Sequence, residues 1–249
     1  MSATTYFVSG GNRGIGFEFV AQLATRANSR VIATAREPEK AIELQALKKK
    51  LGNIEIVKLD VASESSLEAL KKELPTLAPE GIDVFISNAG IGSGFGTVLN
   101  TTRKIVQDHL NTNFLGGLFL FQAVYPYLKK KQTKKAIFIS TMAGSIGAYI
   151  KFPVAAYGSS KVALKYIVHE AAFELADENF TLLAIHPGMV STDMSKSALE
   201  LVSPQTRETM KQHFITPEQS VKQQLEVIDK LTTADSGSFV SYDGSSIPW

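Results

Sequence analysis

The 249-residue chain has no cysteine and only four histidines. Without thiols it can form neither a disulfide framework nor a thiolate metal site, and four scattered histidines make us expect no metal. Its 26 basic and 24 acidic side chains leave a formal charge of +2. A balance so close to zero gives no electrostatic argument for binding nucleic acid or an acidic membrane.

Long hydrophobic runs are also missing. The most apolar stretch, residues 114–128, is interrupted by Gln122 and Pro126 and falls short of the roughly 20 residues that a membrane helix needs. Residues 1–5 lack the charged and apolar segments of a signal peptide. We therefore expect a cytoplasmic protein with no membrane partner.

Short β-branched or aromatic runs alternate with helix-length amphipathic stretches. We expect strands at residues 6–8, 30–35, 54–59, 82–87, 136–140, 181–186 and 238–241. We expect helices at residues 14–27, 39–51, 101–130, 154–176 and 217–231, and another that Ser63 caps and that runs to residue 77. The pattern predicts an α/β fold: one Rossmann-type domain over residues 1–249, with a doubly wound parallel sheet of about seven strands and helices on both faces. Ligands bind such sheets at the carboxyl ends of the strands.

The first expected strand runs into a glycine-rich turn and then a helix. The turn reads Ser9-Gly10-Gly11-Asn12-Arg13-Gly14-Ile15-Gly16. Glycines let the backbone approach a ligand, and a helix N-terminus attracts a pyrophosphate. The alternative is an ordinary turn, which also needs glycine. No Lys-Ser/Thr pair follows the last glycine, which disfavours a phosphoryl-transfer loop. The junction predicts dinucleotide binding.

The end of the second expected strand bears on cofactor choice. An acidic residue there holds the ribose 2′-hydroxyl of NAD, whereas arginine accommodates the 2′-phosphate of NADP. Ala35 stands at that place and Arg36 follows, while Arg13 lies in the glycine-rich turn. These residues favour NADP(H), unless both arginines are merely solvated surface charges.

Tyr157 and Lys161 are four residues apart, so they share one face of an expected helix. An ammonium near a phenol favours the phenolate and lowers its pKa from about 10 toward working pH. A tuned tyrosine can then exchange a proton with a carbinol oxygen. Such pairs also occur on protein surfaces, so the interpretation depends on the accompanying motifs.

Together these motifs resemble the short-chain dehydrogenase/reductase family over nearly the whole chain. Further motifs in the family's order are Leu59-Asp60-Val61, Ser87-Asn88-Ala89-Gly90, Asn113, Ile139-Ser140-Thr141-Met142-Ala143-Gly144 and His186-Pro187-Gly188-Met189-Val190-Ser191-Thr192-Asp193. The C-terminal segment, which ends Ile247-Pro248-Trp249, is similar to the carbonyl-reductase-like branch that includes sniffer, C-factor and norsolorinic acid ketoreductase proteins.

The resemblance implies an NADPH-dependent carbonyl reductase, or ketoreductase, in which Tyr157 donates the proton. Lys161 would lower the phenol's pKa. Asn113 would maintain a helix kink and hold a water molecule that links Lys161 to solvent. Thr141 stands where the family usually has the serine that orients the substrate carbonyl, with Ser140 and Ser145 as alternatives. The residues implied to bind the cofactor are Gly10, Asn12, Arg13, Gly14, Ile15, Gly16, Arg36, Asp60, Val61, Asn88, Ala89, Gly90, Tyr157, Lys161, Pro187, Gly188, Val190 and Thr192.

Other functions stay open at this point. They are an NAD-linked alcohol dehydrogenase, a non-catalytic NADP(H)-sensing protein, and a nucleotide-sugar epimerase or dehydratase. Expected pocket walls at residues 91–95 and 145–152, with a mobile substrate loop at about 189–214, mix apolar and small residues and favour a hydrophobic carbonyl substrate. The resemblance further implies a homodimer or homotetramer. The four histidines, His109 among them, are assigned structural or surface roles.

Overall fold

The computed structural model describes residues 3–249, so the first two residues of the segment expected to lack a signal peptide lie outside it. Within that range no helix combines the length and apolar character needed to cross a membrane. All strand pairs in the sheet are parallel, in the order β3-β2-β1-β4-β5-β6-β7. The strands are Thr4–Val8 (β1), Ser29–Ala35 (β2), Ile54–Lys58 (β3), Val84–Ser87 (β4), Lys135–Ile139 (β5), Thr181–His186 (β6) and Ser238–Ser241 (β7).

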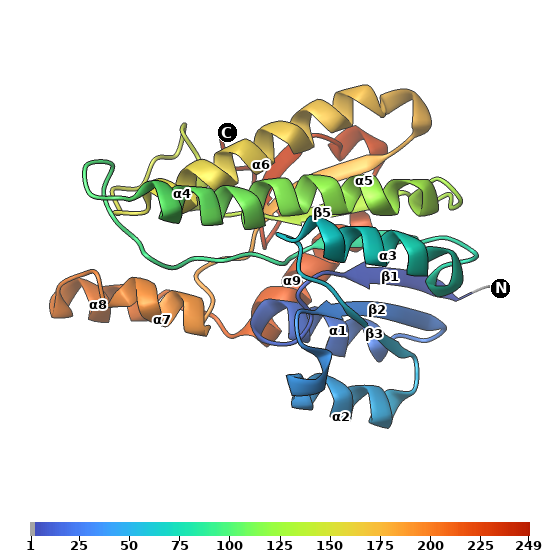
Figure 1. The fold of residues 1–249 in the computed structure, drawn as a ribbon. Coiled ribbons are helices and arrows are strands. Elements are labelled where there is room, and N and C mark those ends of the chain that lie inside the picture. Colours follow the sequence, from blue (N-terminus) through green and yellow to red (C-terminus); the bar gives the residue numbers. More distant parts are fainter. Residues whose placement is uncertain (1–2) are drawn as a thin grey trace.

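Helices cover both faces of the sheet (Figure 1). They are Gly14–Ala24 (α1), Ile42–Leu51 (α2), Glu64–Leu77 (α3), Arg103–His109 (α4), Gly116–Leu128 (α5), Ala155–Glu174 (α6), Asp193–Leu199 (α7), Pro204–Lys211 (α8) and Pro217–Lys230 (α9). One core packs α3, α5 and α6 against the sheet, and the other packs α1, α2 and α9. The expected α/β class and the doubly wound parallel sheet of seven strands are confirmed.

Side-chain alternation along the strands produces these two cores. In β1, Phe7 lies in the core beneath α3, α5 and α6, whereas Tyr6 and Val8 lie in the core beneath α1 and α9. Successive residues of a strand point to opposite faces, so a strand covered on both sides must be apolar throughout. That continuous apolar character made the parallel sheet predictable.

The order in which the chain adds strands to the sheet reverses between β1 and β4, although all strands are parallel. Chain order runs outward from β1 through β2 to β3, and then restarts on the other side at β4. The loops that follow β1 and β4 therefore lead to opposite sides of the sheet and leave a crevice between them. Parallel sheets bind ligands in such a crevice.

The helical region expected over residues 101–130 is confirmed, but it is not uniform. It is divided into α4, a wider π-helical turn at Leu110–Leu115, and α5. Asn113 lies inside the π turn, and its side chain contacts residues outside the helix. Insertions of this kind occur most often at functional sites.

The loop expected at 189–214 is also corrected, because most of it is helical. It holds α7 and α8, which project from one end of the molecule (Figure 1). Neither helix has a fully buried residue, so hydrophobic periodicity gave no signal. The helix-start signals were nevertheless present: Thr192 forms a capping box with Ser195, and Ser203 caps α8 ahead of Pro204.

Candidate active site

The glycine-rich turn places the backbone close to its neighbours. Gly10 and Gly14 have φ angles of +67° and +56°, which L side chains rarely adopt. A Cβ on Gly16 would lie 2.0 Å from the carbonyl oxygen of Gly10. Arg13, at the N-cap of α1, makes no side-chain capping bond, so backbone N–H groups remain for a ligand. This cradle fits a pyrophosphate group.

Ser9 and Asn88 join the ends of β1 and β4 at the crevice. The Ser9 hydroxyl accepts hydrogen bonds from the backbone N–H groups of Asn88 (2.9 Å) and Ala89 (3.0 Å). The Asn88 side chain in turn donates to the carbonyl oxygens of Ser9 (3.0 Å) and Gly10 (3.1 Å). The glycine-rich turn is thereby held against the loop after β4.

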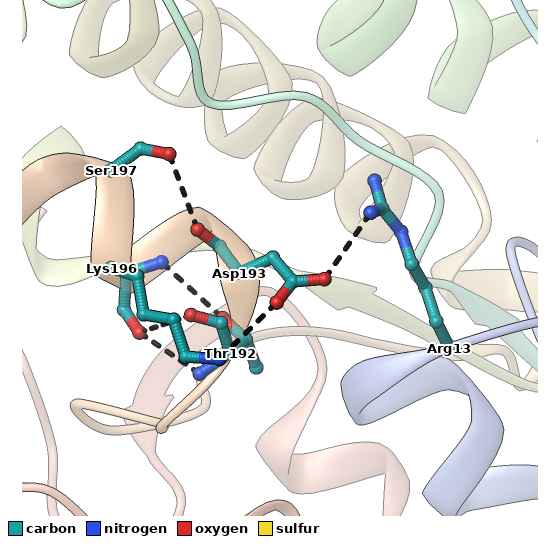
Figure 2. A network of polar contacts seen from close by, with 6 residues as sticks. Arg13, Thr192, Asp193, Lys196 and Ser197 are labelled. Atoms are coloured by element: carbon teal, nitrogen blue, oxygen red, sulfur yellow. Dashed lines mark hydrogen bonds and ion pairs between the residues drawn. The ribbon is translucent and has the colours of Figure 1, made fainter.

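Two arginines lie at the β1–β2 side of the crevice. Arg36 is exposed immediately beyond the end of β2, while Ala35 is buried. Arg13 is also exposed and forms an ion pair of 3.5 Å with Asp193, the first residue of α7 (Figure 2). An exposed pair of this length contributes little stability, so Arg13 remains available to a phosphate.

Asp60 and Val61, expected to contact a cofactor, follow β3. The carboxylate of Asp60 accepts a hydrogen bond from the N–H of Ala62 at 3.0 Å. The side chain of Val61 is buried and packs beside Gly116, where an added Cβ would lie 2.8 Å from it. The Asp60 carboxylate is therefore the more accessible of the two side chains.

The loop after β6 lies over the same crevice. Gly14 faces the methyl group of Thr192, since a Cβ there would lie 3.6 Å from it. Val190 pairs with Ile215, and the Pro187 carbonyl accepts a hydrogen bond from buried Ser220. Beyond this loop, the side chain of Met194 in α7 packs against Gly92. Residues 187–194 thus cross from the turn after β1 to the loop after β4.

Tyr157 lies near the start of α6, and its hydroxyl hydrogen-bonds to Thr141. Burial raises the pKa of the Tyr157 phenol to about 12, although the Thr141 hydrogen bond acts in the opposite direction. The expectation that Lys161 lowers this pKa is not met. The Lys161 ammonium instead donates to the carbonyl oxygen of Ile139 at 2.7 Å, and burial lowers the pKa of Lys161 to about 8.

Three hydroxyl groups were candidates for orienting a substrate carbonyl. Ser145 donates to the carbonyl of Pro248 and accepts from the N–H of Ala148, so its hydroxyl is engaged by the C-terminal segment. Ser140 is buried, and its hydroxyl has no partner within residues 3–249. Thr141 alone of the three hydrogen-bonds to Tyr157. The geometry therefore favours Thr141.

Asn113 connects the π turn to α6. Its amide group donates to the hydroxyl of Ser160 (2.9 Å), which donates to the backbone carbonyl of Tyr157 (2.7 Å). Asn113 also exchanges two hydrogen bonds with Ile91, in the loop after β4. This network fixes the first turn of α6, and hence Tyr157, relative to the crevice.

The expected pocket wall at residues 145–152 lies only partly beside this site. Ile146 and Tyr149 are exposed. With neighbouring residues they line a cavity of about 300 Å³ against Gly158, Ser159 and Val162 of α6, and Tyr157 is not part of its lining. By contrast Phe95, from the expected wall at 91–95, packs edge-on against the Tyr157 ring at 6.0 Å between centroids.

Comparisons with known proteins cover the whole chain. A family model described as short chain dehydrogenase matches residues 4–201. An uncharacterized oxidoreductase of Schizosaccharomyces pombe is 40% identical over 100% of both chains. The norsolorinic acid ketoreductase of Dothistroma septosporum is 33% identical over 99% of this chain and 92% of its own.

Solved structures give the same picture. The NADPH-bound carbonyl reductase from chicken fatty liver has a TM-score of 0.89 and 31% identity, with 100% of both chains covered. The carbonyl reductase Sniffer of D. melanogaster has a TM-score of 0.87 and 26% identity, again over 100% of both chains.

Proposed function

This chain belongs to the short chain dehydrogenase family of oxidoreductases, and from that premise we propose that it is an NADPH-dependent carbonyl reductase acting on hydrophobic ketones or aldehydes. The observation that carries the proposal is the half-buried Tyr157, whose hydroxyl is hydrogen-bonded to Thr141 at the crevice between β1 and β4. With a pKa of about 12 it stays protonated at neutral pH, which is the state that a proton donor needs.

The residues around the crevice fit a phosphorylated dinucleotide. The glycine-rich turn and the α1 N-terminus would hold the pyrophosphate, and Arg13 and Arg36 would hold the 2′-phosphate. Asp60 and Asn88 would contact the adenosine portion, and residues 187–192 the nicotinamide end. The chemistry that the cofactor supplies when bound is a hydride for the carbonyl carbon.

The protein's own groups would then manage the carbonyl oxygen. Thr141 and Tyr157 would hold this oxygen with hydrogen bonds, and Tyr157 would transfer its proton as the oxygen gains negative charge. Asn113, through Ser160, would keep the phenol in place. The Lys161 ammonium, which donates to the carbonyl oxygen of Ile139, would also hold the nicotinamide ribose of the cofactor.

The activity is tested by following NADPH absorbance with a panel of ketones, aldehydes and quinones. We expect NADPH consumption with aromatic or apolar carbonyl compounds and little with sugar phosphates. Consumption of NADPH with none of them would refute the proposed function. A clear preference for NADH would instead favour the NAD-linked alcohol dehydrogenase.

The pH dependence of reduction should report Lys161. Tyr157, with a pKa near 12, remains protonated across the assay range, so it imposes no limit. The Lys161 ammonium is fully present well below pH 8 and is lost as the pH rises through about 8. We therefore expect kcat/KM to be level at low pH and to fall above an apparent pKa of about 8.

A second buried lysine provides the control for this profile. Burial also lowers the pKa of Lys165 to about 8, but its ammonium lies over the ring of Phe239, away from the site. The variant Lys165→Met should keep the fall in kcat/KM at high pH, which we call the descending limb. Loss of the limb in that variant, or a level profile in the unmodified protein, would contradict the assignment to Lys161.

We also propose that the chain forms a homodimer through α5 and α6. These helices border a groove of about 520 Å³, and Phe119, Tyr166 and Phe173 on them are exposed by 44%, 63% and 80%. Large apolar side chains exposed on neighbouring helices are typical of subunit contacts. The chain has a mass of 27.0 kDa, so we expect about twice this mass by size-exclusion chromatography with light scattering.

The variant Phe173→Glu should convert this dimer to a monomer, because it places a charge in an apolar interface. Ile42→Glu is the matched control, since Ile42 is exposed by 68% on α2, on the opposite side of the sheet. It should leave the mass unchanged. A monomeric unmodified protein would exclude the dimer.

A further inference from the structure

His109 is buried beside the ring of Tyr157. It is the last residue of α4, only 2% exposed, and its ring centroid lies 6.2 Å from that of Tyr157, with 73° between the ring planes. This separation and angle belong to the edge-to-face contacts that aromatic rings prefer. In Figure 1, α4 lies alongside the beginning of α6, so the contact joins these two helices.

The imidazole is fixed on one side only. Its Nδ1 lies 2.8 Å from the carbonyl oxygen of Ile105, one helical turn earlier. A carbonyl oxygen only accepts hydrogen bonds, so Nδ1 carries a proton and donates it, and Nε2 is the other polar atom of the ring. Within residues 3–249, nothing hydrogen-bonds to this Nε2, although it is buried.

Packing alone does not account for a histidine at this position. Burying an unpaired polar atom is unfavourable for folding, and a hydrocarbon side chain would fill the same space without this cost. The imidazole provides something that a flexible hydrocarbon lacks: a flat ring whose plane is set by its own hydrogen bond to Ile105.

The Tyr157 ring is contacted from two elements. Phe95 packs edge-on at 6.0 Å and 88°, and His109 packs at 6.2 Å and 73°. Phe95 belongs to the loop after β4, whereas His109 belongs to a helix that leads directly into the π turn with Asn113. The network through Asn113 and Ser160 holds the backbone of Tyr157. His109 contacts its side chain.

We propose that His109 is a positioning residue, whose pinned imidazole holds the Tyr157 ring at the orientation needed for proton transfer. This inference rests on the proposed function, in which Tyr157 is the proton donor. Small displacements of a reacting group lower the rate strongly, whereas cofactor binding depends on other residues. Loss of the imidazole should therefore lower kcat and leave the KM for NADPH unchanged.

Two variants separate the ring from the volume. His109→Ala removes the ring, and we expect kcat to fall by about tenfold or more with little change in the KM for NADPH. His109→Phe keeps a ring but loses the hydrogen bond to Ile105 and the unpaired ring nitrogen. We therefore expect kcat to fall by only about threefold, with no loss of melting temperature. Val106→Ala, at a partly buried position of the same helix, should leave kcat unchanged.

A measurement without turnover completes the test. With ¹³C-labelled tyrosine rings, the NMR signal of Tyr157 is identified by its loss in Tyr157→Phe. We expect this signal to shift and broaden in His109→Ala, but not in Val106→Ala. An unchanged signal in His109→Ala would overturn the inference, as would a kcat of His109→Ala within twofold of the unmodified protein, or a kcat of His109→Phe equal to that of the unmodified protein. If the unmodified protein reduces no carbonyl compound, the proposed function fails and the ring signal alone decides the role of His109.

Discussion

Replacing Tyr157 by phenylalanine is expected to lower the kcat of carbonyl reduction by about 100- to 10,000-fold, the range that a positioned proton donor contributes. The substitution removes one hydroxyl group and its hydrogen bond to Thr141. The ring itself should keep its place between Phe95 and His109, because those contacts are made by ring edges and faces. Rapid-mixing assays of NADPH oxidation would measure the effect, and NADPH binding by fluorescence should change little.

The matched control for this variant is Tyr166→Phe. Tyr166 is on the same helix as Tyr157, but is 63% exposed. This change should leave kcat as it is, because it keeps the ring that the proposed dimer contact uses. Turnover within a few-fold of normal in Tyr157→Phe would remove Tyr157 from the proposed mechanism. A parallel loss of NADPH binding would instead mean that the hydroxyl acts on the cofactor.

Replacing Arg36 by alanine is expected to raise the KM for NADPH by about 10- to 100-fold while leaving the KM for NADH nearly unchanged. A hydrogen bond to a charged group contributes about 1.5–3 kcal/mol, and each 1.4 kcal/mol is a factor of ten in affinity. Arg36 is exposed at the end of β2, with no acidic side chain at the neighbouring Ala35. A 2′-phosphate is the one group that distinguishes the two cofactors, so the two KM values should separate.

Lys40→Ala controls for long-range charge. Lys40 is exposed near Arg36 and pairs with Glu37 at 2.6 Å, so its removal changes the local charge equally. Lys40→Ala should change the KM values for NADPH and NADH only slightly, and by the same factor. If Arg36→Ala weakened both cofactors equally, the 2′-phosphate would have to be recognised elsewhere, and Arg13 would be the next position to test.

Several elements followed directly from the local sequence. The strand at Thr181–His186 and the strand at Ser238–Ser241 have the expected bounds, and Ser63 caps α3 by accepting a hydrogen bond from Ser66. Each of the other five strands differs from expectation by one or two residues at one or both ends. The glycine-rich turn has the predicted place between β1 and α1, because its glycines meet steric limits that other residues cannot satisfy.

Other features could not be predicted from local patterns. The π turn depends on the contacts of Asn113 with Ile91 and Ser160, the latter 47 positions away. The engagement of Ser145 depends on Pro248, 103 positions further along the chain. The helices α7 and α8 have too little buried surface for hydrophobic periodicity to reveal them.

The parallel sheet, the turn that suits a pyrophosphate and the position of Tyr157 one helical turn before Lys161 could all be inferred from the amino-acid sequence. Each of these depends on residues that are close along the chain. The folded structure was needed to show the raised pKa of Tyr157, the hydrogen bond from Lys161 to Ile139 and the contact of His109 with the phenol ring. These depend on burial and on the meeting of distant segments, which no local pattern records.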